Sequence, residues 1–482
     1  MRVLSAFLLS VFFLHSVVGA APVRGYASTV QPLATKAALD SLARGGNAID
    51  AAVAAALTLG VVDGHNSGIG GGCFFLVRLA DGRTFCFDGR ETAPAAASRD
   101  MYLLNGEADG TLSKTGALAS GVPGALAVYS TVLERFGKLS LADALQHGIR
   151  HAEEGFPIDE VYASKLDATA ADLARFPASR KIFLGTDGKP LKQGEALVQK
   201  ELAASYRAIT EQGVAWFYET TFAEAVEAWM CGNGGILTSG DFVDYQIVVR
   251  EPLASTYRGW TVLGVPPPSS GGVHVAQMLN ILETFDPAML KPGTAAFAHT
   301  LTETMKLAFA DRAHWLGDPA FTPVPLGLVA KEYAKVLARR IDPEKATPVD
   351  GHSLPPDWQN NHFDKHTTHF ATADALGNWV SCTATINTGF GSKVVIPGTG
   401  ILLNNEMDDF SIAPGKPNAF GLIGGEANAV APGKRPLSSM SPTLVLKDDR
   451  VVLSIGAAGG PTIISQVLQG LVNCSDHGMT PA

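Results

Sequence analysis

The 482-residue chain is short of charge, and acidic residues outnumber basic ones. Charged residues make up only 17% of it, the net charge is −9, and no block of Lys or Arg occurs. Nucleic acid, whose phosphates are bound by clustered basic side chains, is therefore excluded as a partner. The chain also lacks an H-E-x-x-H pair, a cysteine cluster and a phosphate-binding loop with its lysine. We therefore expect neither a metal nor a cofactor.

Cysteine is scarce, and the five that occur show no C-x-x-C pair and no metal-ligand spacing. Because the number is odd, at least one of them is expected to be unpaired. A bridge between Cys73 and Cys86 stays open for an oxidising compartment, and buried free thiols are the alternative.

Long apolar runs are missing except at the N-terminus. Leu4 to Val18 is apolar, follows the basic Met1-Arg2 and leads into the small residues Val18-Gly19-Ala20. The run is too short to span a bilayer comfortably, and it has the three parts of a secretory signal. Residues 1–20 are therefore predicted to be a cleaved signal peptide that exports the protein to the periplasm or the extracellular space. A buried N-terminal helix is the alternative.

Apolar residues and glycine are abundant, with 46% hydrophobic residues and 51 glycines, which is ample for a large core with many tight turns. The segment from about 118 to 340 is mostly helical in pattern. Helices are predicted at residues 32–43, 48–59, 139–152, 199–212, 296–316 and 461–472. Strands are predicted at residues 74–79, 84–87, 367–374, 379–385, 442–446 and 450–455. Helices before and after paired strands favour an α+β fold with antiparallel sheets.

Residues 342–366 differ from the rest, because they are rich in proline and polar residues and have little periodicity. This pattern predicts an exposed, flexible linker that ends where a strand begins, at Thr367. A threonine hydroxyl needs a base to become a nucleophile. Cutting the chain before Thr367 would supply one, since a free α-amine has a pKa of roughly 7.7–8.0. The position of Thr367 alone does not establish this role, because many threonines begin strands.

A series of longer motifs carries more information than this position does. They are Gly45-Gly46-Asn47-Ala48-Ile49-Asp50, Arg90-Glu91-Thr92-Ala93-Pro94, Thr367-Thr368-His369-Phe370, Thr383-Ala384-Thr385-Ile386-Asn387-Thr388, Gly400-Ile401-Leu402-Leu403-Asn404-Asn405-Glu406-Met407-Asp408-Asp409-Phe410, Lys434-Arg435-Pro436-Leu437-Ser438-Ser439 and Gly459-Gly460. In content and order they resemble the γ-glutamyltranspeptidase family of N-terminal-nucleophile hydrolases. The resemblance runs from about residue 28 to residue 472, which is nearly the whole mature chain.

The resemblance implies a four-layer αββα sandwich and self-cleavage between His366 and Thr367. A large subunit, residues 21–366, and a small subunit, residues 367–482, would then form one intertwined catalytic domain. Thr367 would attack the γ-carbonyl of glutathione and its conjugates and hold the γ-glutamyl group as an ester. Water or an amino-acid or dipeptide acceptor would receive that group. The expected enzyme is thus a γ-glutamyltransferase with glutathione hydrolase activity.

The same resemblance implies roles for the residues around the reacting carbonyl. Thr385 is expected to orient the hydroxyl or the amine of Thr367. The N–H groups of Gly459 and Gly460 are expected to form the oxyanion hole, where a single donor can contribute about 3–4 kcal/mol to the rate.

A γ-linked glutamate also carries a free carboxylate and a free ammonium on one carbon. The resemblance implies that Arg90 binds the carboxylate in a forked pair. The remaining binding residues are Ser438 and Ser439 at the carboxylate, and Asn387, Glu406 and Asp409 at the ammonium. His369, which the family shares, is expected to be structural.

Two departures from the family pattern bear on these expectations. The aromatic residue of the lid loop, often Tyr in the family, is Phe420 here, so closure over the site is expected to be looser. The chain also stops at Ala482, where the family normally continues. Two rivals remain: a cephalosporin acylase that cleaves glutaryl groups, and a truncated paralogue without catalysis.

Overall fold

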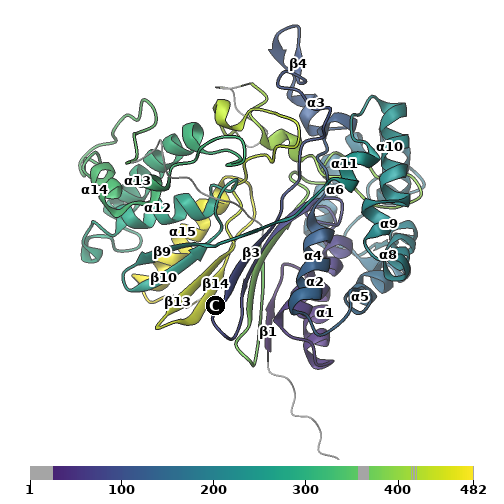
Figure 1. The fold of residues 1–482 in the computed structure, drawn as a ribbon, viewed down its shortest axis with the longest axis horizontal. Helices are drawn as coiled ribbons and strands as arrows, with labels where there is room; N and C mark the ends of the chain where they lie inside the picture. Colours follow the sequence, from purple (N-terminus) through teal and green to yellow (C-terminus); the bar gives the residue numbers. More distant parts are fainter. Residues whose placement is uncertain (1–24, 357–368, 414, 416–417, 419–420, 481–482) are drawn as a thin grey trace, which may run out of the picture.

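The computed structural model describes residues 25–356, 369–413, 415, 418 and 421–480, and the folded chain is an α+β protein with antiparallel sheets (Figure 1). The six-stranded sheet has the order β1-β11-β12-β2-β3-β8, and the four-stranded sheet has the order β14-β13-β10-β9. The larger sheet consists of β1 (Gly25–Ser28), β2 (Gly72–Arg78), β3 (Thr84–Gly89), β8 (Val248–Arg250), β11 (Phe370–Asp374) and β12 (Trp379–Thr385). The smaller sheet consists of β9 (Leu253–Tyr257), β10 (Trp260–Gly264), β13 (Thr443–Lys447) and β14 (Arg450–Ile455). Two short ribbons pair β4 (Leu103–Leu104) with β5 (Glu107–Ala108) and β6 (Phe156–Pro157) with β7 (Ala196–Leu197).

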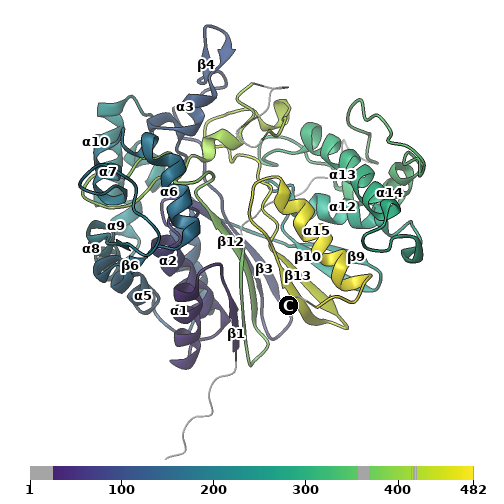
Figure 2. The same cartoon turned by 180° about the vertical axis from the view of Figure 1, so that it is seen from behind.

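Helices cover the outer face of each sheet, as the two opposite views show (Figures 1 and 2). Beside the larger sheet lie α1 (Pro32–Ala43), α2 (Ala48–Val62), α4 (Ala125–Phe136), α5 (Leu141–Glu154) and α8 (Lys200–Gln212). Beside the smaller sheet lie α12 (Gly271–Leu282), α13 (Ala295–Trp315), α14 (Lys331–Ala338) and α15 (Thr462–Ser475). The remaining helices are α3 (Gly110–Lys114), α6 (Glu160–Leu173), α7 (Pro177–Phe183), α9 (Ala215–Tyr218), α10 (Thr221–Asn233) and α11 (Ser239–Val243). Short 3-10 turns are η1 (Ala117–Ala119), η2 (Pro287–Met289), η3 (Leu326–Val329), η4 (Glu406–Asp409) and η5 (Glu426–Asn428).

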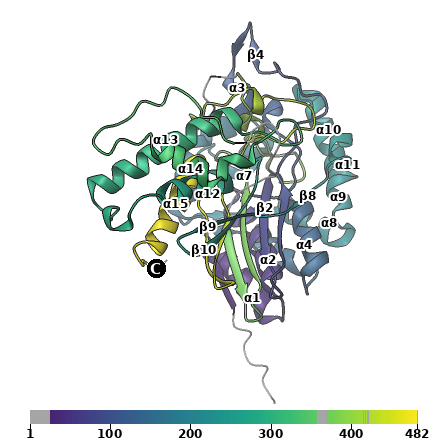
Figure 3. The same ribbon diagram turned by 60° about the vertical axis from the view of Figure 1, so that its left-hand side comes forward.

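The core is divided by the larger sheet, whose strand β2 is buried on both faces. Phe75 and Val77 pack into the apolar cluster of α2, α4 and α5. Phe74 and Leu76 point the other way and pack with Val262 of β10 and with α12 and α15. Because both faces of β2 are covered, its sequence is a continuous apolar run. The sheets thus pack against each other, with the two helical groups outside them (Figure 3).

The start of α2 is fixed by hydrogen bonds that also position β11. Asn47 and Asp50 form a capping box, and the Asp50 carboxylate accepts further bonds from the Lys138 and Leu139 amides at 3.0 and 2.9 Å. At the same point, Thr372 Oγ1 donates to the Ala48 carbonyl at 2.6 Å. The strand that follows the linker is therefore anchored to the first turn of a buried helix.

Most of the predicted elements are confirmed. The bounds of α1, β12 and β14 are those predicted, and α2 runs past its predicted end at residue 59 to Val62. In residues 342–356, the described part of the linker, no helix or strand forms. The segment from 118 to 340 is mostly helical, as expected, but it also contains three strands longer than two residues, β8, β9 and β10. These three strands are only three to five residues long. β9 and β10 form a hairpin, and pairing with the distant strands β3 and β13 stabilises β8 and β10.

None of the five cysteines forms a disulfide bond in the structure. Cys73 packs in the cluster with α2, whereas Cys86 packs in the cluster between the sheets. Their side chains thus lie on opposite faces of the same sheet, which settles the open question of a bridge between them. No helix in the described part of the chain is both long and apolar enough to cross a membrane. The predicted signal peptide, residues 1–20, lies outside the described residues.

Candidate active site

A cavity of about 150 Å³ lies where the ends of β12 and β14 meet the loops before α15 and around η4. This is smaller than the ~300–1,000 Å³ of sites for drug-sized ligands, so it suits a small molecule. The predicted site residues that line it are Thr385, Asn387, Glu406, Asp409, Ser438, Ser439, Gly459 and Gly460. His369 and Phe370, at the start of β11, line it too. His366, Thr367 and Phe420 lie outside the described residues, so their predicted roles stay predictions.

The glycine pair occupies the turn between β14 and α15. Gly459 has φ +115° and Gly460 has φ +60°, which are backbone angles that residues other than glycine rarely adopt. Thr462 closes the turn by donating its hydroxyl to the Gly459 carbonyl at 2.9 Å. Because the turn directly precedes the N-terminus of a 14-residue helix, the helix dipole favours negative charge there. The location suits the predicted oxyanion hole.

Thr385 is the last residue of β12, and its hydroxyl oxygen is held on one side. Oγ1 accepts a hydrogen bond from the Asn387 amide at 2.7 Å, which leaves the hydroxyl hydrogen for another acceptor. Asn387 has φ +74°, and its Nδ2 donates to the Asn405 carbonyl at 2.8 Å. A side chain on Gly71 would come within 1.9 Å of the Thr385 carbonyl oxygen, so glycine is required there.

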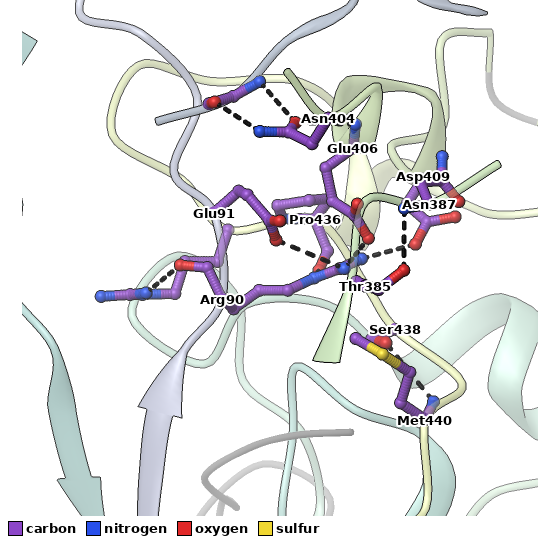
Figure 4. A network of polar contacts seen from close by, with 12 residues as sticks. Arg90, Glu91, Thr385, Asn387, Asn404, Glu406, Asp409, Pro436, Ser438 and Met440 are labelled. Carbon is purple, nitrogen blue, oxygen red and sulfur yellow. Dashed lines mark hydrogen bonds and ion pairs between the residues drawn. The ribbon is translucent and has the colours of Figure 1, made fainter. Parts of the chain in front are cut away.

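Arg90 lies behind the cavity and forms ion pairs with two of the predicted ammonium ligands (Figure 4). Its side chain is fully buried, with Nη1 against Glu406 and Nη2 against Asp409. Nε donates to the Pro436 carbonyl at 3.1 Å. The sequence pattern assigned Arg90 and the two acids to opposite ends of a substrate. The structure brings them into direct contact, and Arg90 is not among the residues that line the cavity.

Glu91 adds a third buried carboxylate to this cluster, at 3.6 Å from Nη1 of Arg90. Burial is the main cause that raises the pKa of Glu91, to about 8, and it also raises the pKa values of Glu406 and Asp409. Among the three carboxyl groups, Glu91 has a pKa of about 8, so it is expected to hold a proton at neutral pH.

Glu91→Gln is expected to flatten the pH dependence of stability. The pKa of Glu91 is raised in the folded state, so between about pH 5 and 8 the folded chain binds a proton that the unfolded chain has released. The stability of the native protein should therefore fall as pH rises through this range, by about 2 kcal/mol or more. The variant should lose most of this fall. Melting temperatures of both proteins from pH 5.5 to 8.5 test this, and parallel curves would contradict it.

Sequence reasoning missed two residues of the site, Arg312 and Asp63. Arg312 on α13 is only 4% exposed and donates to Ser439 Oγ at 3.0 Å. Its signal in the sequence was a charge four residues after the apolar Ala308, which is a same-face spacing on a helix. Asp63, after α2, lines the cavity, and burial raises its pKa to about 7. Nothing in its local pattern marked it.

Within the described ranges, no group of three or more acidic, histidine or cysteine side chains is placed to hold a metal ion. The His369 side chain is half-buried, and loss of solvent around its ring lowers the pKa of the ring to about 4. Its Nδ1 lies 3.3 Å from Ser381 Oγ, and because His369 also lines the cavity, its structural role stays a prediction.

Comparison with known proteins identifies the family of the chain. The sequence profile of the family described as Gamma-glutamyltranspeptidase matches residues 34–482. The "Glutathione hydrolase proenzyme" of Escherichia coli (strain K12) is 43% identical over 96% of this chain and 80% of its own length. A cephalosporin acylase from Bacillus halodurans aligns with a TM-score of 0.83 and 29% identity, covering 99% of this chain and 85% of its own. The γ-glutamyltranspeptidase of Helicobacter pylori aligns with a TM-score of 0.67 and 36% identity, covering 70% and 97%. This chain therefore belongs to the γ-glutamyltranspeptidase family.

Proposed function

We propose that the protein is an exported, self-cleaving γ-glutamyltransferase that also hydrolyses glutathione. The observation that carries the proposal is one small cavity in which acids, Glu406 and Asp409, lie close to the hydroxyls of Ser438 and Ser439 and to the glycine turn. Residues 1–20 direct export. Cleavage before Thr367 gives subunits 21–366 and 367–482, which together form an αββα sandwich of the N-terminal-nucleophile type.

Substrate recognition exchanges one set of ion pairs for another. The ammonium of the γ-glutamyl group donates hydrogen bonds to the carboxylates of Asp409 and Glu406 and to the side-chain oxygen of Asn387. This releases N–H groups of Arg90, which turn to the substrate carboxylate. The hydroxyls of Ser438 and Ser439 donate to the same carboxylate. Charge-assisted hydrogen bonds contribute roughly 1.5–3 kcal/mol each, so a zwitterion is strongly preferred.

The first reaction is self-cleavage. The Thr367 hydroxyl attacks the His366 carbonyl carbon, the peptide C–N bond breaks, and the acyl group moves to the threonine oxygen as an ester. Water hydrolyses this ester, which leaves a free carboxylate on His366 and a free amine on Thr367.

Transfer then uses that amine as the base. It takes the proton from the Thr367 hydroxyl, whose oxygen attacks the γ-carbonyl carbon, and the Gly459 and Gly460 N–H groups bind the oxyanion. Thr385 donates its free hydroxyl hydrogen to the Thr367 oxygen and so orients it. As the intermediate collapses, the ammonium returns its proton to the leaving amine. Water or an acceptor amine then attacks the γ-glutamyl ester and restores Thr367.

A glutaryl acylase is the second candidate, and the TM-score of 0.83 with the cephalosporin acylase favours it. The charges of the cavity favour the γ-glutamyl substrate. A glutaryl group has a carboxylate but no ammonium, so Glu406 and Asp409 would be left beside a substrate of like charge. A paralogue without catalysis is separated from both by a denaturing gel, on which a self-cleaving chain gives two bands.

Matched donors test the proposed function. We expect a γ-glutamyl anilide to be cleaved with a kcat/KM about 100-fold or more above that of the glutaryl anilide, because only the first has an ammonium. Asp409→Asn should reduce this ratio by about 10-fold or more, since it removes one ammonium partner. A dipeptide acceptor should speed release from the wild-type enzyme. The rates of anilide release measure all three effects.

Asp408→Asn is the matched control for Asp409→Asn. Asp408 is the neighbouring residue, but its carboxylate accepts from Ser113 Oγ at 2.6 Å and is not part of the cavity lining. This variant should keep the donor ratio. Equal rates on the two donors in the wild type, or equal ratios in wild type and Asp409→Asn, would refute the assignment.

A further inference from the structure

Arg312 is a second buried guanidinium beside the cavity, and it differs from Arg90 in its partners. Arg90 is paired with carboxylates, whereas Arg312 forms no ion pair with any described residue. Its Nε donates to Ser270 Oγ at 2.9 Å and its Nη2 to Ser439 Oγ at 3.0 Å. Burial lowers the pKa of Arg312 to about 10, so it stays protonated at neutral pH. A buried cation that has only neutral partners is unfavourable unless an anion binds nearby.

The direction of the hydrogen bond at Ser439 decides what this serine can do. Because Arg312 has only donors, the Ser439 oxygen must be the acceptor, and its own hydrogen is left to donate. Within the described chain no acceptor takes that hydrogen, and Ser439 lines the cavity. The serine is therefore held with a polarised O–H available to the cavity.

The groups packed around Arg312 leave its positive charge in place. His274 on α12 is buried, and burial, the larger cause, lowers its pKa to about 3, so its ring is neutral. Asp409 is the acid whose field acts on Arg312, and it is already paired with Arg90. Arg312 does not line the main cavity, and the void that it lines together with Asp409 has a volume of about 10 Å³. That volume holds at most about one water molecule, so Arg312 acts through Ser439.

We propose that Arg312 is a positioning residue for the substrate carboxylate, which it serves by fixing Ser439 as a hydrogen-bond donor and by adding positive charge behind it. The proposal rests on the γ-glutamyl function proposed above and adds a residue to its carboxylate end. Arg90 shares its charge with Glu406 and Asp409, so only part of that charge acts on the substrate carboxylate. Arg312 supplies the charge that distinguishes a carboxylate from a neutral group of the same shape.

The test compares a γ-glutamyl anilide with its α-carboxamide analogue, which has no carboxylate charge. Arg312→Met should raise KM for the γ-glutamyl anilide about 10- to 100-fold and change kcat less than about threefold. KM for the carboxamide should change far less. Arg312→Lys, which restores the charge, should recover part of the loss. In a Ser439→Ala background, Arg312→Met should have a much smaller effect, because the group through which it acts is gone.

Binding of L-glutamate, measured by calorimetry on the cleaved enzyme, separates this inference from the proposed function. A higher Kd for L-glutamate in Arg312→Met supports the inference, even if the enzyme cleaves no anilide. The absence of anilide cleavage would refute only the proposed function. If Arg312→Met is active with an unchanged KM, or if its kcat falls equally on both donors, the inference is overturned. The proposed function is unaffected by either result.

Two further variants control for folding. Arg258→Met removes a partly buried arginine that pairs with Asp476 at 3.2 Å and is absent from the cavity lining; it should leave both KM values unchanged. If Arg312→Met does not yield two subunits, Arg312→Gln carries the test, because it keeps an N–H donor for Ser439 and loses only the charge. A Gln variant with wild-type KM on both donors would overturn the proposal.

Discussion

Thr367→Ala is expected to give a single uncut chain with no transferase or hydrolase activity. The change removes the oxygen that attacks the preceding carbonyl, so the acyl shift cannot begin. Without the cut, residue 367 has no free amine, and without the hydroxyl it has no nucleophile. Both losses fall on the same step, and activity should drop by more than about 10³-fold.

A denaturing gel and N-terminal sequencing measure this result. Thr368→Ala is the matched control, since it makes the same chemical change one residue later and should still give two subunits with Thr367 at the start of the smaller one. Two subunits cut at the same bond in Thr367→Ala would show that another group performs the cleavage. An active wild-type small subunit with any other first residue would contradict the proposed chemistry.

Arg90→Met is expected to lower the free energy of unfolding by about 3–5 kcal/mol, because it leaves buried carboxylates without their cation. Glu406 is 1% exposed and Glu91 is fully buried, so solvent cannot replace the guanidinium. The carbonyl oxygens of Pro436 and Leu437 also lose a donor. Some of the cost will be recovered at low pH, where the carboxylates bind protons.

Urea denaturation in the Thr367→Ala background measures this cost on a single chain. Arg83→Met is the control, because Arg83 pairs with Asp81 at 2.8 Å on the surface, with 63% of its side chain exposed. Removing an exposed pair should cost about 1 kcal/mol or less. Equal losses in the two variants would mean that the Arg90 cluster adds nothing to stability.

Local patterns were enough to predict the elements that begin and end with strong signals. Helix α1 starts with Pro32 at its first turn and stops before Gly45 at φ +92°, so its bounds follow from the backbone preferences of two residues. Strand β14 and its partner flank a short polar turn. By contrast, β8 and β10 pair with β3 and β13, which lie far away in sequence, and the three to five residues of each strand are too few to show a clear period.

The candidate site shows the same division. The family motifs predicted the residues that line the cavity, because each motif contributes a contiguous piece of the wall. They did not predict that Arg90 binds Glu406 and Asp409, a contact between residues more than 300 positions apart. The motifs also did not identify Arg312. Its proposed role depends on its contact with Ser439, which the position of α13 creates.

The strand order has a consequence for the life of the processed enzyme. In the larger sheet, β11 and β12 are inserted between β1 and β2, and in the smaller sheet β13 is inserted between β14 and β10. A break in the linker would therefore leave each fragment without complete sheets of its own. Separating the fragments requires loss of both cores, so the mature pair should dissociate only as it denatures and should not exchange halves with its neighbours.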